Sequence, residues 1–381
     1  MLVKFKKFKL TQLLLVIIFI SCTVPGESSV QDTTTTTESQ ETPTTTVAPS
    51  TTTTTEDKKT STVENCGNLE GSPFIDDEKI RVFAASDLNQ DTVNSTLEFA
   101  NEAYDLWMSE NYYGICQAKA IYLMITGSDI DAGRKANQEH CDFLKDMKFE
   151  SAEWCSATTS DGYVNNGGAG INSSGPVQGF YFMVMGPRGN NLSNFYKTMT
   201  YHEVIHIYQI SNIYSRTFEE VDTKMGKRTG DDPNIDVAWW AEGNADFLAA
   251  LYSSDLSGDF RRLMRDALES TGPFKISRKQ RYIGNKQKLY NISWDQGETV
   301  DLAYRIGSWF TAYLVHNHGE QSIYDFWESV DKDSFDNTFI KVFGKDYRTY
   351  TDEFDVWLQQ SNTELFKILK PIYNSKIKEA G

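Results

Sequence analysis

The residues best suited to chemistry form the segment Tyr201–His206, which reads YHEVIH. His202 and His206 are four positions apart, so on a helix both imidazoles leave the same face and can bind one metal ion. Glu203 lies beside them, where a carboxylate can hold a metal-bound water and act as its general base. Apolar residues at helical spacing predict such a helix over 192–210. Two histidines that are hydrogen-bonded inside a core are the structural alternative.

A catalytic zinc has three protein ligands and a water, so this helix needs a partner that supplies one more ligand. The segment 236–253 is also expected to be a helix, with Asp236 as its N-cap. Glu242 and Asp246 lie four positions apart on it, among small residues that permit close approach of another helix. We therefore expect Glu242 to be the third ligand and Asp246 to accept the outer N–H of a ligating histidine. The alternative for Glu242, a solvated carboxylate, fits less well beside two tryptophans.

Together these segments resemble the gluzincin metallopeptidases. The resemblance rests on His202-Glu203-x-x-His206 followed by Trp240-Ala241-Glu242-Gly243-Asn244-Ala245-Asp246. It is a similarity to thermolysin-like, aminopeptidase N-like and peptidase MA-like domains, and it covers roughly residues 190–360. It implies one Zn²⁺ ion per chain bound by His202, His206 and Glu242, with Glu203 as the base.

A further match is Ala303-Tyr304-Arg305-Ile306-Gly307, which resembles the Y-x-x-G segment of the aminopeptidase N-like enzymes. The resemblance implies that the Tyr304 hydroxyl stabilises a tetrahedral oxyanion; a core aromatic is the alternative. The Gly-x-Met-Glu-Asn segment that captures a substrate's free amine does not occur in this sequence. Amino-terminal specificity is therefore not indicated. The apolar strand 179–185 is a candidate for an edge strand that pairs with an extended peptide substrate.

The first 21 residues have the character of a signal peptide. A basic start precedes an apolar run that is too short to span a membrane. The run ends in Phe19-Ile20-Ser21-Cys22, which resembles a bacterial lipobox although Phe19 departs from the usual Leu. The resemblance implies that Cys22 is lipidated and anchors an extracytoplasmic protein to a bacterial membrane; simple secretion is the alternative. Residues 22–65 are rich in threonine and are expected to be a disordered linker.

The remaining cysteines are even in number and are expected to form two disulfides in an oxidising compartment, with three possible connectivities. They are Cys66, Cys116, Cys141 and Cys155. The formal net charge of −16 argues against a nucleic-acid partner, because such proteins carry a basic surface. His140, His316 and His318 are expected to be structural.

The globular part, 66–381, is expected to be α+β. A mixed lobe with a β-sheet (66–190) precedes a mainly helical lobe (191–381), with the zinc site in the cleft between them. In the first lobe we expect strands at 79–85, 118–126 and 179–185, a helix at 95–110 and a loop at 165–176. Beyond the two helices named above, helical patterns occupy 258–270, 300–317, 320–331, 334–343 and 349–370.

The sequence thus predicts a zinc metallopeptidase that cuts peptide or protein substrates outside the cytoplasmic membrane. Two other functions remain open at this point. One is a catalytically inactive surface or adhesion module that keeps the fold. The other is a zinc hydrolase that acts on a non-peptide amide.

Overall fold

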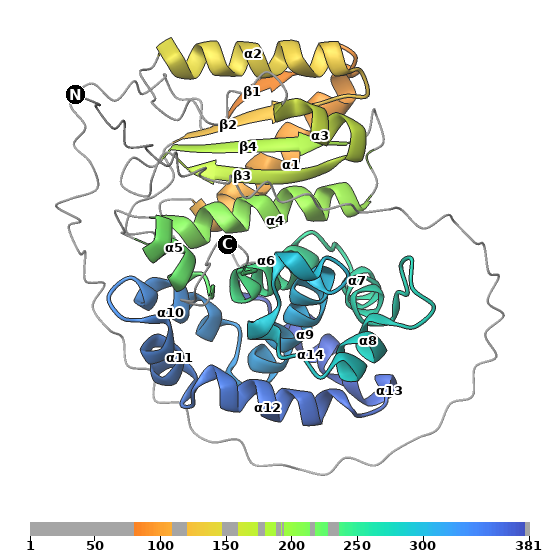
Figure 1. The fold of residues 1–381 in the computed structure, drawn as a ribbon, viewed down its shortest axis with the longest axis vertical. Coiled ribbons are helices and arrows are strands. Elements are labelled where there is room, and N and C mark those ends of the chain that lie inside the picture. Colours follow the sequence, from red (N-terminus) through yellow and green to blue (C-terminus); the bar gives the residue numbers. More distant parts are fainter. Residues whose placement is uncertain are drawn as a thin grey trace, which may run out of the picture.

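The computed structural model describes residues 80–108, 120–146, 159–173, 180–187, 192, 194–213, 218–227 and 236–377. The expected signal peptide and the expected linker lie outside the described residues, as do Cys22, Cys66, Cys116 and Cys155. The described residues form an α+β structure, in which a small mixed sheet precedes a mostly helical part (Figure 1). The predicted fold class is therefore confirmed.

A four-stranded sheet forms the first lobe, in the order β1-β2-β4-β3. β1, β2 and β4 are parallel, and β3 runs antiparallel to β4. β2 and β4 are nearly continuous apolar runs, as burial on both faces of a sheet requires. The predicted strands at 79–85, 118–126 and 179–185 are confirmed. The strands are β1 (Ile80–Ala84), β2 (Ala120–Ile125), β3 (Gly168–Ser173) and β4 (Phe180–Gly186).

Two expectations for this sheet are wrong. The segment expected to be a loop contains β3, whose sequence GAGINS has only one β-branched residue, Ile171, and no aromatic residue to mark a strand. Gly170 leaves room there for Tyr163, because a Cβ at this position would lie 2.8 Å from the Tyr163 hydroxyl oxygen. The segment 179–185 is not an edge strand either, because β4 lies between β2 and β3. The edge of the described sheet on this side is β3.

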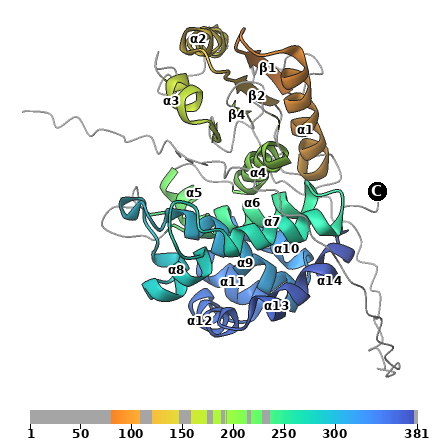
Figure 2. The same cartoon turned by 90° about the vertical axis from the view of Figure 1, so that its right-hand side faces the viewer.

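Four helices surround the sheet (Figures 1 and 2). α2 packs on β1 and β2, and α3 packs on β4 and α2. α1 and α4 pack against each other, α1 also contacting β1 and α4 also contacting β3. α1 and α4 were predicted, whereas α2 and α3 were missed because few of their residues are apolar. The helices are α1 (Gln90–Met108), α2 (Ile130–Asp146), α3 (Thr159–Asn166) and α4 (Asn194–Ser211).

The helical lobe is built around α6 and α9, which make the most extensive helix contact in the described structure. All residues of α6 are buried, and the helix packs on α4 on its other side. The expected helix at 349–370 is wrong as one element: α12 ends at Leu358, and the Ser361 side chain caps α13. The helices are α5 (Phe218–Lys224), α6 (Trp239–Tyr252), α7 (Ser257–Glu269), α8 (Arg278–Asn285), α9 (Val300–His318), α10 (Gln321–Val330), α11 (Phe335–Phe343), α12 (Tyr347–Leu358), α13 (Asn362–Leu365) and α14 (Leu369–Asn374).

Two glycines set the distance between α6 and α9. A Cβ on Gly243 would lie 2.6 Å from the Gly307 carbonyl carbon, so no larger residue fits at this crossing. The close approach brings the N-terminal half of α9, with Tyr304, against the part of α6 that carries Glu242.

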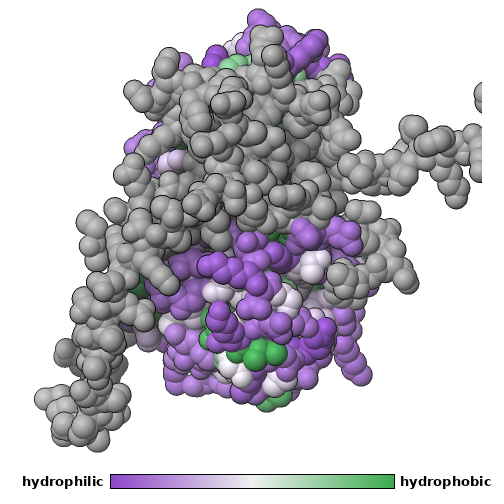
Figure 3. Space-filling view, turned by 90° about the vertical axis from the view of Figure 1, so that its left-hand side faces the viewer, coloured by the Kyte–Doolittle hydropathy of each residue, from purple (hydrophilic) through white to green (hydrophobic). Residues whose placement is uncertain are grey.

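The surface of the helical lobe on the side shown in Figure 3 is mostly hydrophilic around a small apolar area. None of the helices that the structure describes has the length and hydropathy of a membrane span.

Candidate metal centre

Three side chains from α4 and α6 converge at the junction of the two lobes. His202 and His206 extend from one face of α4, and Glu242 extends from α6. The two Nε2 atoms are 2.9 Å apart, and Glu242 Oε2 lies 3.2 Å from His202 Nε2 and 3.0 Å from His206 Nε2. Ligand atoms around one tetrahedral zinc lie roughly 3.3–3.5 Å apart at bonds of about 2.1 Å, so the observed triangle is only slightly tighter. These residues form a buried group that could hold a metal ion.

The outer nitrogen of each imidazole is held by an acceptor, which fixes how the ring presents its inner nitrogen. His202 Nδ1 donates to Asp246 Oδ1 at 3.0 Å, and His206 Nδ1 donates to Gln209 Oε1 at 2.8 Å. The Gln209 amide is itself oriented, because its Nε2 donates to the Ala241 carbonyl at 3.0 Å. A ligating histidine needs this arrangement, since a protonated Nδ1 leaves the Nε2 lone pair free for a metal.

Charge at the centre also favours a cation. With its proton on Nδ1, His206 has a lone pair on Nε2, and this lone pair faces the Glu242 carboxylate. Two acceptors this close to each other are stabilised by a positive charge beside them. Burial lowers the pKa of His202, but its hydrogen bonds to Asp246 and Glu242 outweigh burial and raise it to about 10. Burial raises the pKa of Glu242, yet its contacts with His206 and His202 hold it far below its ordinary value. When no metal is bound, a proton on His202 supplies the positive charge, and a divalent cation would displace that proton.

Glu203 lies next to this group but does not belong to it. Its carboxylate makes none of the hydrogen bonds or ion pairs identified in the described structure, and it is only 2% exposed. Burial raises the pKa of Glu203, and the charges of His202 and His206 oppose that rise. Glu203 lines a cavity of about 20 Å³, which is room for about one water molecule. A carboxylate with a raised pKa beside a water-sized cavity has the properties of a general base.

Tyr304 of α9 completes the wall of the centre on one side. Its ring is stacked on His202, with centroids 6.1 Å apart and an angle of 20° between the planes. Its hydroxyl is buried and has no partner within hydrogen-bond geometry in the described part of the chain. Burial raises the pKa of Tyr304 well above its ordinary value, and the charge of Glu242 raises it further. The hydroxyl therefore stays protonated and can donate a hydrogen bond to an anionic group placed beside it.

Arg305, for which the sequence indicates no role, contacts the carboxylate that holds His202. Arg305 Nη1 donates to Asp246 Oδ2 at 2.7 Å, while the other oxygen of Asp246 accepts from His202. The charge of Arg305 helps to keep the pKa of Asp246 below its ordinary value despite burial. Gln209 was also missed. Its only signal in the sequence is its place three residues after His206, on the same side of the helix.

Other predicted residues take different places. Asp236 is not an N-cap, because α6 begins after Ala238, which makes no side-chain cap, and Asp236 instead pairs with Ser293 in an isolated bridge. His316 and His318 lie in the last turn of α9, away from the centre, as expected. His140 is buried on α2 between aromatic rings. Cys141 is disulfide-bonded, and its partner lies outside the described residues.

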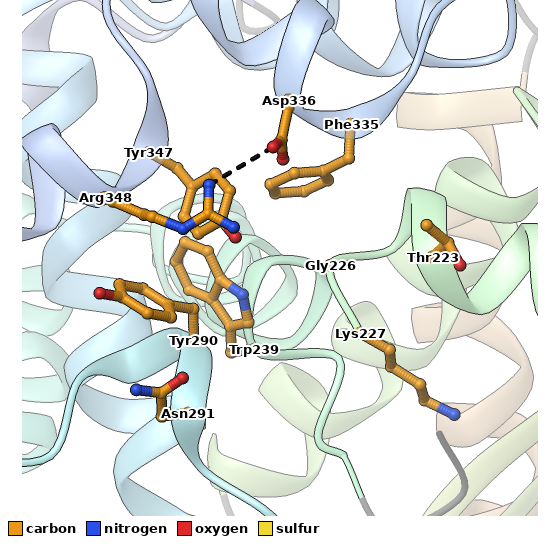
Figure 4. A pocket seen from close by; sticks show the side chains of 10 residues that line it. All are labelled: Thr223, Gly226, Lys227, Trp239, Tyr290, Asn291, Phe335, Asp336, Tyr347 and Arg348. Atoms are coloured by element: carbon orange, nitrogen blue, oxygen red, sulfur yellow. Dashed lines mark hydrogen bonds and ion pairs between the residues drawn. The ribbon is translucent and has the colours of Figure 1, made fainter. Parts of the chain in front are cut away.

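A larger pocket of about 290 Å³ opens near the start of α6 (Figure 4). Its wall combines aromatic rings, among them Trp239 and Tyr290, with the ion pair between Arg348 and Asp336. None of the three candidate metal ligands lines it. The larger pocket is therefore separate from the candidate metal centre, and His202 and Glu203 line the small cavity instead.

Comparison with known proteins adds no assignment to this geometry. No protein-family model matches the chain, and no curated protein matches it.

Proposed function

We propose that this protein is a zinc-dependent hydrolase that cleaves peptide bonds, similar to the gluzincin metallopeptidases. The observation that carries the proposal is the convergence of His202 Nε2, His206 Nε2 and Glu242 Oε2 on one point, with Glu203 beside it. Two imidazoles and one carboxylate, with a water-sized space adjoining, are the donor set of a catalytic rather than a structural zinc. We also propose an extracytoplasmic, membrane-anchored location, which the lipobox-like segment at Cys22 supports.

Zinc bound at this centre would polarise the substrate carbonyl and make an adjacent water more acidic. Glu203 then removes a proton from the attacking water as its oxygen adds to the carbonyl carbon, and transfers that proton to the amide nitrogen as the C–N bond breaks. Tyr304 donates its hydroxyl hydrogen bond to the oxyanion of the tetrahedral intermediate. Asp246 and Gln209 hold the imidazoles in their productive tautomers.

The proposal is tested by digesting a peptide library with the purified full chain and identifying the products by mass spectrometry. We expect cleavage that a chelator abolishes and added zinc restores. Glu203→Gln is the matched variant, because it keeps the shape of the residue and is not a ligand. It should retain the metal and lose about 10³-fold in kcat, since a general base contributes about 10²–10⁴-fold.

Two results would contradict the proposal. One is cleavage that persists at full rate in a chelator, and the other is Glu203→Gln activity within a fewfold of the unaltered protein. If the metal binds but only non-peptide amides are hydrolysed, the centre is catalytic and the substrate class is wrong.

A further inference from the structure

Basic residues are concentrated in one short part of this acidic chain. Between Phe260 and Lys288 the sequence has nine Arg and Lys residues and two acidic residues, whereas the whole chain has 37 basic and 53 acidic residues. The segment comprises most of α7, all of α8 and the loop that joins them. Its charge is therefore opposite to that of the molecule as a whole.

Four of these cations are exposed and make no ion pair among the residues that the structure describes. They are Arg261, Arg265, Lys275 and Lys286. Others in the segment are neutralised within the fold: Arg278 and Arg281 share Asp301, and Lys288 pairs with Asp352 and Asp355. The four exposed cations take no part in these internal pairs, so their positive charges are available to a binding partner.

Exposed apolar side chains accompany these cations. Leu256, just before α7, is 68% exposed, Ile276 in the loop is 48% exposed, and Ile283 of α8 is 40% exposed. Single exposed apolar residues are ordinary on a protein surface. Here three of the seven large ones found among the described residues fall within or next to the basic segment. The combination is cationic and apolar, which is the composition of surfaces that lie on membranes.

The two helices that carry most of these residues are neighbours. α7 and α8 are in contact, and Arg278 of α8 donates to the Asp266 carbonyl of α7 at 2.8 Å. Arg261 and Arg265 lie one turn apart on α7, both over the ring of Phe366. Both views place α7 and α8 on the same side of the helical lobe, the side that Figure 2 turns toward the viewer. We name the surface formed by the exposed residues of this basic segment, with Leu256 and Asp259 next to it, the α7–α8 surface.

We propose that the α7–α8 surface binds an anionic lipid bilayer, with its cations at the headgroups and Ile276 and Ile283 inserted among them. Charge complementarity selects this occupant, because each basic residue near an anionic membrane strengthens binding by about fivefold. The exposed isoleucines favour a bilayer over a soluble polyanion, which offers nothing apolar to bury. None of the metal-centre residues belongs to the surface, so the proposal does not depend on the proposed function.

The test measures co-sedimentation of the full chain with vesicles. The chain carries Cys22→Ser, so that no acyl chain contributes to binding. The vesicles are phosphatidylcholine alone or phosphatidylcholine with about one third phosphatidylglycerol. A surface variant replaces Arg261, Arg265, Lys275 and Lys286 with Gln. A matched control replaces Lys135, Lys145, Lys332 and Lys341 with Gln; these residues are also exposed and make no ion pair in the described structure, and they lie on α2 and around α10 and α11.

We expect the parent protein to prefer the anionic vesicles and the surface variant to lose at least about tenfold in affinity for them. The control has the same net charge as the surface variant and should bind like the parent. Ile276→Ser with Ile283→Ser should weaken binding at least about threefold with an unchanged melting temperature. Each of four results would overturn the proposal. The surface variant and the control bind equally, the parent shows no preference for anionic vesicles, the isoleucine variant is unaffected, or the parent binds soluble polyphosphate as tightly as vesicles.

Discussion

Buried histidines occur in two regions of this protein, and they behave in opposite ways. His140 of α2 is 2% exposed between Phe83 and Phe182, and burial lowers its pKa to about 4. His202 of α4 is 5% exposed, yet its pKa is raised to about 10 because Asp246 and Glu242 accept from its two nitrogens. Burial by itself makes a histidine neutral and inert. The carboxylates, rather than the burial, therefore distinguish the candidate centre from the core.

The largest effect that would sharpen this comparison is expected at Tyr304. Tyr304→Phe removes a hydrogen bond made chiefly in the transition state, so kcat should fall about 10²–10³-fold while KM changes little. The melting temperature should stay the same, because Phe keeps the ring stacked on His202.

Tyr196→Phe is the matched control for this change. Tyr196 lies on α4 and its hydroxyl bonds to Thr96 at 3.1 Å, so it is a structural tyrosine near the same helix. Its loss should lower the melting temperature and leave kcat unchanged. An unchanged kcat in Tyr304→Phe would remove the oxyanion assignment.

A smaller effect, on metal affinity, is expected at Asp246, the carboxylate that accepts from His202 Nδ1 and has no counterpart at His140 among the described residues. Asp246→Asn removes the charge that orients His202 and pairs with Arg305, and such changes cost about 10–100-fold in metal affinity. Competition with a chromophoric chelator measures this affinity. Asp301→Asn, which breaks a pair with Arg278 and Arg281 in the same lobe, is the control and should leave it unaltered. Equal affinities for the two variants would mean that Asp246 does not support the metal.

A third effect concerns stability at the inert histidine and leaves the metal centre untouched. Unfolding restores the pKa of His140 from about 4 to about 6.5, so the unfolded chain binds the extra proton between these values. Stability therefore falls as pH decreases through this window, by up to roughly 3 kcal/mol from this group. His140→Leu should remove this part of the pH dependence, as followed by denaturant unfolding at pH 7 and pH 4. An identical loss of stability in both proteins would contradict the buried neutral state of His140.

Local spacing predicted the centre well, because its residues lie on two helices with strong patterns. The four-residue spacing of His202 and His206, and of Glu242 and Asp246, places each pair on one helix face. The structure shows these two faces, on α4 and α6, directed at each other, with Glu242 Oε2 3.2 Å from His202 Nε2. Glycine and alanine in α6 indicated close packing, but the sequence did not reveal which helix approaches.

The missed features depend on contacts between distant residues. β3 has a composition closer to that of a loop, and its strand is formed by pairing with β4. α2 and α8 are too polar to show a marked apolar stripe, and tertiary packing stabilises them. Arg305 supports the centre through Asp246, which is 59 residues away along the chain. No local pattern could indicate that pairing.

The metal content of the purified full chain tests the central claim most directly. The arrangement of His202, His206 and Glu242 predicts about one zinc per chain by elemental mass spectrometry, in the unaltered protein and equally in His140→Leu. His206→Ala should reduce the content to a small fraction of one, with the fold retained by circular dichroism. A protein that holds no stoichiometric metal when purified without chelators and supplied with zinc, or one that loses nothing in His206→Ala, would contradict the account.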